Sequence, residues 1–469
     1  MQNRFLCAVI TLVSCVSAFA AEAGRPSAGF IQRTMKALEE STFDDPAHVR
    51  VLFYGQSIVE QGWHTHVISE LSKRYPSARL EVANRAIGGF TSPELSQTAK
   101  SDLYPFYPDL LFFHVYGPLD KYEEIVRRTR ELTTAEIVLW TSHLDRTEGA
   151  SRESVEKLLK DPDERSRGIR RIAEKYGCLF VDLRKKWCKA ILESGLSVTN
   201  VLKDGIHLRD DGPGMELYAR FLSEELVRIP GEEGASEFSG KVKKVPFWDK
   251  SVRHFPDGRV ELPFVGNRVV AVADGRGGCA VRVMLDGRDP RGFPEMYYNS
   301  RPSRIASPWM PAINHVDSLP GARMVEQDWR YVFLEGTEPF TPIHFRIEGS
   351  VTGLEGEGWS TNEFRSASGR VVIPADQPSR WQYEYFAKDK PERQAKPGQV
   401  LRWSTRPLFE DPYVPRAAGV RTTLVQNCPN GEHTLSLSTG SGSAGIAWFL
   451  VYEPAGDRFA SHRCNQGGE

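Results

Sequence analysis

Short apolar runs alternate with amphipathic stretches between residues 50 and 230. A short run of consecutive apolar residues is typical of a strand that is buried on both faces of a sheet. The clearest run begins at Val51 and ends at Gly55, a residue that permits a tight exit from a strand. We predict the following strands in this region: Val51–Tyr54, Leu80–Ala83, Leu110–Val115, Ile137–Trp140 and Leu179–Asp182.

The stretches between these strands place apolar residues at helical spacing. Residues 67–75, 169–176 and 215–226 each gather their apolar side chains on one helical face, and Gly177 follows the second stretch as a C-terminal cap. A shorter helical stretch, residues 26–40, precedes the first strand. Strands and helices that alternate along a chain predict a parallel sheet with helices on both faces, so the first domain is expected to be α/β.

The pattern changes after about Pro246, where the helical period disappears. Residues 279–285 alternate apolar and polar side chains, as a half-buried strand does, and Asp257-Gly258 predicts a turn. Residues 422–427 and 433–438 flank Pro429-Asn430-Gly431, which predicts a β-hairpin. Seven of the ten tryptophans lie beyond Val245. We therefore expect one large all-β sandwich, similar to a jelly roll, in the second half of the chain.

The N-terminus has the pattern of a secretory signal peptide. Arg4 supplies a positive charge, residues 5–13 an apolar core, and Ala18-Phe19-Ala20 a cleavage site. The protein is therefore expected to be exported, to the periplasm or the extracellular medium. Residues 12–15 also resemble a bacterial lipobox, so a lipid anchor on Cys15 is the alternative, although residues 16–23 are more apolar than the usual tether.

These changes of pattern divide the chain into segments. We expect a signal peptide at 1–20, a helical lead-in at 21–47, the α/β domain at 48–230, a linker at 231–246, the β-sandwich at 247–455 and a tail at 456–469. Beyond the signal peptide, no apolar segment approaches the roughly 18 residues that a membrane span needs, so no transmembrane span is expected.

Composition narrows the classes of partner. The 469-residue chain has a net charge of -1 and no long basic run, so nucleic acid is not an expected partner. The cysteines lack the close pairs of a zinc site, and no metal is predicted. Cys178 with Cys188 and Cys279 with Cys428 are candidate disulfides in an oxidising compartment, with buried free thiols as the alternative.

Three short segments carry residues suited to chemistry. Ser57 follows the first strand, and in open α/β sheets ligands bind at the carboxyl ends of strands, although a Ser in this place is often only a helix N-cap. Gly88 and Gly89 follow the second strand and allow the backbone to approach a ligand closely. Asp204 and His207 are three residues apart before the last helix, a spacing that lets the carboxylate orient the imidazole.

Together these segments resemble the SGNH hydrolases, also called the GDSL esterase family, over residues 50–227. Gly55-Gln56-Ser57-Ile58 stands where that family has G-D-S, residues 84–91 resemble its second block, and Asp204 and His207 match its last block. The resemblance implies a flavodoxin-like three-layer fold in which Ser57, His207 and Asp204 are catalytic. It also implies that the N–H groups of Ser57 and Gly89 bind the oxyanion, and that no cofactor is needed.

The third block departs from the family pattern. The family has G-x-N-D at the end of the third strand, whereas this chain has Gly117-Pro118-Leu119-Asp120, in which neither Pro118 nor Leu119 has a donor side chain. One oxyanion donor is therefore missing or supplied from elsewhere. His114 and His143 are candidate substitutes and, with Gln56, candidate substrate-binding residues; a packed core or rim position is the alternative for each histidine.

The resemblance also narrows the expected activity. Exported SGNH proteins with an appended β-sandwich resemble carbohydrate esterases, so we expect an O-acetylesterase whose partner is an acetylated polysaccharide or oligosaccharide. An acetyltransferase or a general small-acyl esterase on the same triad, or a non-catalytic sugar-binding protein, are the alternatives. Trp381, Tyr383 and Tyr385 are candidate sugar-stacking side chains, with a place in the core as the other interpretation.

Overall fold

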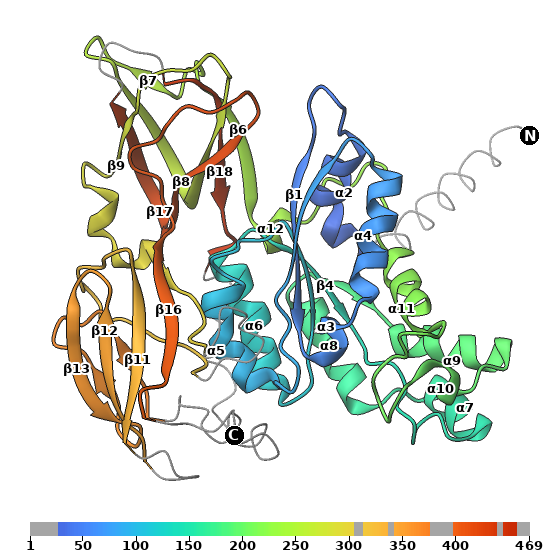
Figure 1. Ribbon diagram of the computed structural model, residues 1–469. Coiled ribbons are helices and arrows are strands. Elements are labelled where there is room, and N and C mark those ends of the chain that lie inside the picture. The colour runs from blue at the N-terminus through green and yellow to red at the C-terminus, as the bar shows by residue number, and fades with distance from the viewer. Residues whose placement is uncertain (1–26, 304–312, 336–341, 376–396, 439–443, 457–469) are drawn as a thin grey trace, which may run out of the picture.

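The computed structural model describes residues 27–303, 313–335, 342–375, 397–438 and 444–456 (Figure 1). The predicted signal peptide with Cys15, the aromatic residues Trp381, Tyr383 and Tyr385, and the tail beyond Gly456 lie outside the described residues. In the described part, a helix-covered parallel sheet lies beside a region of antiparallel strands.

A five-stranded parallel sheet forms the centre of the first domain. Its order is β2-β1-β3-β4-β5, which is the flavodoxin-like order and confirms the predicted α/β fold. The strand β1 pairs with both β2 and β3, so that Val51 lies opposite Val82 on one side and Leu110 on the other. The strands are β1 (His48–Gly55), β2 (Arg79–Asn84), β3 (Leu110–His114), β4 (Glu136–Trp140) and β5 (Leu179–Val181).

Helices cover both faces of this sheet, as the sequence predicted. Successive residues of β1 enter opposite cores: Val51 and Phe53 join one buried cluster, and Leu52 and Tyr54 join the other. The helical segments are η1 (Ser27–Ile31), α2 (Gln32–Glu39), α3 (Ser57–Glu60), α4 (Trp63–Arg74), α5 (Ser92–Asp102), α6 (Leu119–Leu132), α7 (Arg152–Lys160), α8 (Glu164–Lys175), α9 (Leu183–Ser194), α10 (Val198–Val201), α11 (Gly214–Ser223) and α12 (Ser236–Ser239). Gly177 follows α8 with a φ of 57°, as its predicted role as a cap requires.

The second half of the described chain is antiparallel β structure, which confirms an all-β second domain. One sheet has the order β6-β18-β8-β17-β9, with β7 also paired to β8, and the other has the order β10-β16-β11-β12-β13. The two sheets bury separate clusters of side chains. The first sheet contains β6 (Lys241–Pro246), β7 (Arg253–His254), β8 (Arg259–Ala273), β9 (Arg282–Leu285), β17 (Arg421–Ser438) and β18 (Ile446–Glu453). The second contains β10 (Tyr297–Asn299), β11 (Gln327–Glu335), β12 (His344–Gly349), β13 (Gly353–Trp359) and β16 (Val400–Pro407), while β14 (Phe364–Arg365) pairs with β15 (Val372–Ile373).

The predicted hairpin around Pro429-Asn430-Gly431 is wrong. Residues 421–438 form the single long strand β17, and both of its halves pair with β8 rather than with each other. The register shifts between Gln426 and Gly431, so the turn-forming residues make a bulge instead of a reversal. Both halves have the same neighbouring strand available, which is a property of the sheet and not of the local sequence.

The two domains are packed together through a buried contact. One face of the six-stranded sheet packs around Tyr107, which precedes β3, and the Tyr107 hydroxyl donates to Asn267 Oδ1 at 2.8 Å. Asn267 Nδ2 in turn donates to the carbonyl of Leu132 at 2.9 Å. Both Tyr107 and Leu132 precede parallel strands, so this sheet covers the edge of the first domain opposite to the carboxyl ends of its strands (Figure 1).

The described residues include four of the cysteines considered for disulfide bonds. Cys178, Cys188, Cys279 and Cys428 are free thiols, so neither candidate disulfide is formed. Cys279 is exposed, while the other three are buried. Within the described ranges there is no cluster of side chains that could hold a metal ion. The same part of the chain has no helix with the length and apolar character that crossing a bilayer requires.

Candidate active site

The end of β1 presents Ser57 at the carboxyl edge of the sheet. Gly55 is required there, because a Cβ at this position would lie 2.1 Å from the carbonyl oxygen of His114 on the neighbouring strand. The chain then turns through Gln56 into α3, whose first residue is Ser57. Gln56 caps this short helix, since its side chain accepts the N–H of Ile58 and its carbonyl accepts the N–H of Glu60 at 3.0 Å. Ser57 is therefore held on a defined turn.

Three predicted residues from two distant segments of the chain form a hydrogen-bonded series. His207 Nε2 lies 2.8 Å from Ser57 Oγ, and His207 Nδ1 lies 2.9 Å from Asp204 Oδ2. The other carboxylate oxygen, Oδ1, accepts the N–H groups of Ile206 and His207, each at 2.8 Å. These bonds fit an imidazole that donates its Nδ1 proton to Asp204 and accepts the hydroxyl proton of Ser57 at Nε2.

The same hydrogen bonds keep Asp204 ionised. Burial alone would raise the pKa of this carboxyl, but the backbone N–H groups of His207 and Ile206 and the His207 ring outweigh it and lower the pKa to about 2. Asp204 and His207 are nevertheless accessible, with 51% and 31% of their side chains exposed. The series therefore lies at the surface, where a large alcohol or ester can reach it.

The loop that carries His207 is braced on both sides. Gln61, just after α3, accepts the N–H of Leu208 at 3.0 Å through Oε1 and donates to its carbonyl at 2.9 Å through Nε2. On the other side, His143 Nε2 lies 2.7 Å from the carbonyl of Ile206. Both neighbours of His207 are thus fixed. Sequence reasoning missed Gln61, whose only signal was its place four residues after Ser57.

The predicted oxyanion segment lies beside α3. Asn84 joins the two, because its Nδ2 donates to the carbonyl of Val59 at 2.8 Å while its Oδ1 accepts the N–H of Ala86 at 3.0 Å. Ile87 then donates its N–H to the carbonyl of Gly55 at 2.9 Å. Gly89 follows with a φ of 80°, a conformation that favours glycine. The segment is therefore tied to the turn that presents Ser57.

The third-block residues do not supply a side-chain donor. Leu119 begins α6 and packs against α8, where its Cδ1 lies 2.4 Å from the position that a Cβ on Gly168 would take. The backbone before it is held by Ser92, which donates its N–H to the carbonyl of Tyr116 at 2.9 Å and its hydroxyl to that of Pro118 at 2.7 Å. Position 119 is therefore part of the packing between helices.

The residues predicted to bind substrate are buried. Gln56 is 2% exposed and caps α3, and His143 braces the His207 loop. His114 is 1% exposed, stacks on Trp140 at 5.4 Å and has its Nε2 3.2 Å from Ser142 Oγ. Burial lowers the pKa of His114 to about 3 and that of His143 to about 4, so both are neutral near pH 7. The contacts described for all three are those of packing and positioning.

A doubly wound sheet with a Ser-His-Asp series at its carboxyl edge defines the class of protein: an α/β protein with the triad arrangement of serine hydrolases. The chain resembles the SGNH hydrolases in its motif residues, in its strand order and in the order Ser, Asp, His along the chain.

Comparison with known proteins gives distant structural likenesses. No family model and no curated protein matches the sequence. Among solved structures, the chain is similar to a two-domain esterase active on acetylated mannans, with 12% identity, 90% of this chain and 95% of that chain covered, and a TM-score of 0.36. It is also similar to Axe2, an acetylxylan esterase from Geobacillus stearothermophilus, with 22% identity and a TM-score of 0.32. The match covers 40% of this chain and 97% of Axe2. A putative GDSL-like lipase from Parabacteroides merdae matches with 20% identity and a TM-score of 0.32, and the match covers 38% of this chain and 95% of the lipase.

Proposed function

We propose that this protein is an exported serine esterase that removes acetyl groups from a polysaccharide or oligosaccharide. The observation that carries the proposal is the hydrogen-bonded series of Ser57, His207 and Asp204 at the carboxyl edge of the sheet. The acetylated substrate follows from the resemblance of an exported SGNH protein with an appended β-sandwich to carbohydrate esterases. Two of the similar solved structures are a two-domain esterase active on acetylated mannans and an acetylxylan esterase.

The geometry supports acyl transfer through a covalent intermediate. Ser57 Oγ attacks the ester carbonyl carbon while its proton passes to His207 Nε2, and Asp204 stabilises the imidazolium that forms. The tetrahedral oxyanion is assigned to the N–H groups of Ser57 and Gly89. Collapse of the intermediate breaks the bond to the sugar oxygen, which takes the proton from His207 and leaves acetyl-Ser57. Water then attacks the acyl group, with His207 as the base, and releases acetate.

A backbone oxyanion site is consistent with the local hydrogen bonds. The cap formed by Gln56 uses the N–H groups of Ile58, Val59 and Glu60, and the N–H of Ser57 is not among its donors. Leu119 contributes no donor, so the proposed site relies on main-chain groups more than the family pattern would imply. Backbone donors cannot rotate away, which suits a site that must be ready before charge develops.

The decisive experiment removes the nucleophile. Ser57→Ala should lower kcat on p-nitrophenyl acetate by several orders of magnitude while thermal unfolding stays unchanged, because the hydroxyl is the attacking group. A fluorophosphonate should label wild-type Ser57, located by peptide mass spectrometry. If the variant keeps a tenth or more of the wild-type rate, the assignment of the nucleophile is wrong.

A further inference from the structure

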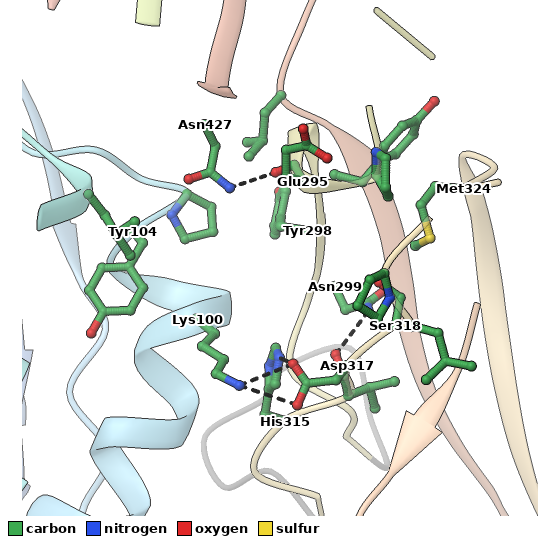
Figure 2. A pocket seen from close by; sticks show the side chains of 18 of the residues that line it. Lys100, Tyr104, Glu295, Tyr298, Asn299, His315, Asp317, Ser318, Met324 and Asn427 are labelled. Atoms are coloured by element: carbon green, nitrogen blue, oxygen red, sulfur yellow. Dashed lines mark hydrogen bonds and ion pairs between the residues drawn. The ribbon is translucent and has the colours of Figure 1, made fainter. Parts of the chain in front are cut away.

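A cavity of about 510 Å³ lies between the two domains (Figure 2). Its helical side contains Lys100 and Tyr104, from the end of α5 and just beyond it. α5 begins at Ser92, close after Gly89, so the cavity lies toward the opposite end of this helix from the triad. Binding pockets commonly have this size and occur at domain interfaces. None of the proposed catalytic residues lines it.

Two tyrosines stand on opposite sides of the cavity. Tyr104 lies on the helical side and Tyr298 on β10, an edge strand of the five-stranded sheet (Figure 2). Both are only partly buried. A tyrosine offers an apolar ring face together with a polar hydroxyl, so it suits a ligand whose ring has both C–H faces and hydroxyl groups. The two walls are therefore suited to a sugar ring.

The charged side chains of the lining balance one another. Lys100 Nζ lies 3.1 and 3.2 Å from the two carboxylate oxygens of Asp317 (Figure 2). The charge of Lys100 is therefore neutralised by a neighbouring side chain of the cavity wall. Arg128 and Glu295 add one charge of each sign. The cavity thus has no surplus positive charge for a phosphate or a carboxylate. A neutral ligand with many hydroxyl groups is the better match.

A residue of the β17 bulge also lines the cavity. Asn427 has a φ of 69°, a left-handed conformation that asparagine adopts more readily than most residues, and it lies in the bulge of β17. Its Nδ2 donates to the carbonyl of Glu295, another lining residue, at 2.6 Å (Figure 2). Bulges are often found next to binding sites, where they re-aim a side chain.

A second Ser-His-Asp series borders the cavity but does not make a second esterase site. Ser101 Oγ lies 3.3 Å from His315 Nδ1, and His315 Nε2 lies 3.0 Å from Asp317 Oδ1. Ser101 is 3% exposed, and Lys100 neutralises the carboxylate. This series instead joins α5 to the β domain and fixes one wall of the cavity.

We infer that the cavity binds a neutral oligosaccharide, as a second site separate from the triad. Tyr298 and Tyr104 pack against sugar rings, and Asn427 and Glu295 bond to hydroxyl groups. The inference goes beyond the proposed esterase function and rests on it only for the choice of sugars. Such a site would bind unacetylated sugar units of a polymer while acetylated sugar units of the same polymer reach Ser57.

Calorimetric titration of the full chain with unacetylated mannohexaose and xylohexaose tests the inference. Wild type should bind at least one of them, with little dependence on salt because no charge pair is made. Tyr298→Ala should weaken binding about tenfold or more, and Tyr298→Phe, which keeps the ring, should retain most of it. Asn427→Gly should also weaken binding, and its backbone suits the positive φ, so the variant should fold well.

Trp248 supplies the matched control, because it is 77% exposed, stacks on His254 and does not line the cavity. Trp248→Ala should leave binding unchanged, and all variants should keep the wild-type rate on p-nitrophenyl acetate. Absence of binding by wild type, or binding that survives Tyr298→Ala and Asn427→Gly, would overturn the inference. So would selective binding of oligogalacturonate that salt abolishes. Failure of the esterase proposal would appear separately, as hydrolysis that does not depend on Ser57.

Discussion

At the scale of single residues, each side chain of the proposed triad is held in place by other groups. Ser57 is presented by a turn that only Gly55 permits, and His207 is oriented by Asp204. The loop around His207 is then held by Gln61 and His143, neither of which touches the reacting atoms. Loss of one of these bracing contacts would displace His207 relative to Ser57. In an enzyme, a misplacement of about 1 Å between reacting groups can lower the rate about 10²-fold.

Gln61→Ala tests this bracing. Loss of both hydrogen bonds to Leu208 should let the His207 loop move, so kcat on p-nitrophenyl acetate should fall about 10-fold to 100-fold while KM changes little. Gln61→Glu should also be impaired, because its carboxylate would face the carbonyl of Leu208. Thermal unfolding curves provide the control for folding. Full kcat in a folded Gln61→Ala variant would show that Gln61 is not a positioning residue.

Leu119→Asn restores the residue type that the family has in its third block. The sequence alone would predict a neutral or mildly activating effect, but the structure changes that expectation. Leu119 is partly buried against α8 beside Gly168, so an amide at this position would lose apolar packing and would lie away from the oxyanion. We expect a lower Tm and no gain in kcat. An increase in kcat would show that the side chain reaches the oxyanion instead.

At the scale of elements, α5 connects the site to the rest of the molecule. Its N-terminus follows Gly89, and its C-terminal turn meets the β domain through Lys100 and Asp102. Asp102 is buried, with Oδ1 3.1 Å from Arg301 Nε of the β domain, and its backbone carbonyl accepts Arg85 Nη1 at 2.6 Å. Burial raises the pKa of Asp102 from 3.8 to about 6, although both arginines act in the opposite direction.

This raised pKa predicts a pH dependence of stability. Because the folded-state pKa of Asp102 lies above its unfolded value, folding favours the protonated carboxyl. The stability associated with this protonated form is fully present below about pH 4 and is lost as pH rises through 6. The rise corresponds to about 3 kcal/mol. Asp102→Asn cannot ionise, so its Tm relative to wild type should improve from pH 4.5 to pH 7.5. Asp44→Asn, at an exposed position, is the matched control, and a parallel pH dependence in wild type and Asp102→Asn would contradict the assignment.

At the scale of the whole molecule, the β domain leaves the triad edge accessible. The six-stranded sheet packs on the opposite edge through Tyr107 and Asn267, and the second sheet lies along α5 (Figure 1). In the proposed substrate the acetyl group buries little area, so we expect most of the binding energy to come from the sugar part. The exposure of Asp204 and His207 fits a broad, polar substrate better than an enclosed lipid chain.

The acyl-chain profile tests this interpretation. Rates on p-nitrophenyl esters should fall steeply from acetyl to butyryl, and kcat/KM should be much higher on an acetylated oligosaccharide than on the aryl acetate. Released acetate from acetylated mannan, xylan, xyloglucan and pectin gives the measurement. Rates that rise toward eight-carbon chains, with no acetate from any glycan, would point to a general or lipid esterase.

The sequence by itself determined the elements whose pattern is local. The apolar runs located β1, β3, β4 and β5, because strands buried on both faces tolerate few polar residues. The motif spacing pointed to Ser57, Asp204 and His207, which lie in one hydrogen-bonded series. Tertiary structure decided the features that depend on contacts between elements distant in the sequence. Both halves of β17 pair with β8, so a local hairpin signal became a bulge. Leu119 turns toward α8, and Gln61 reaches Leu208, because neighbouring elements, not adjacent residues, offer these groups their contacts.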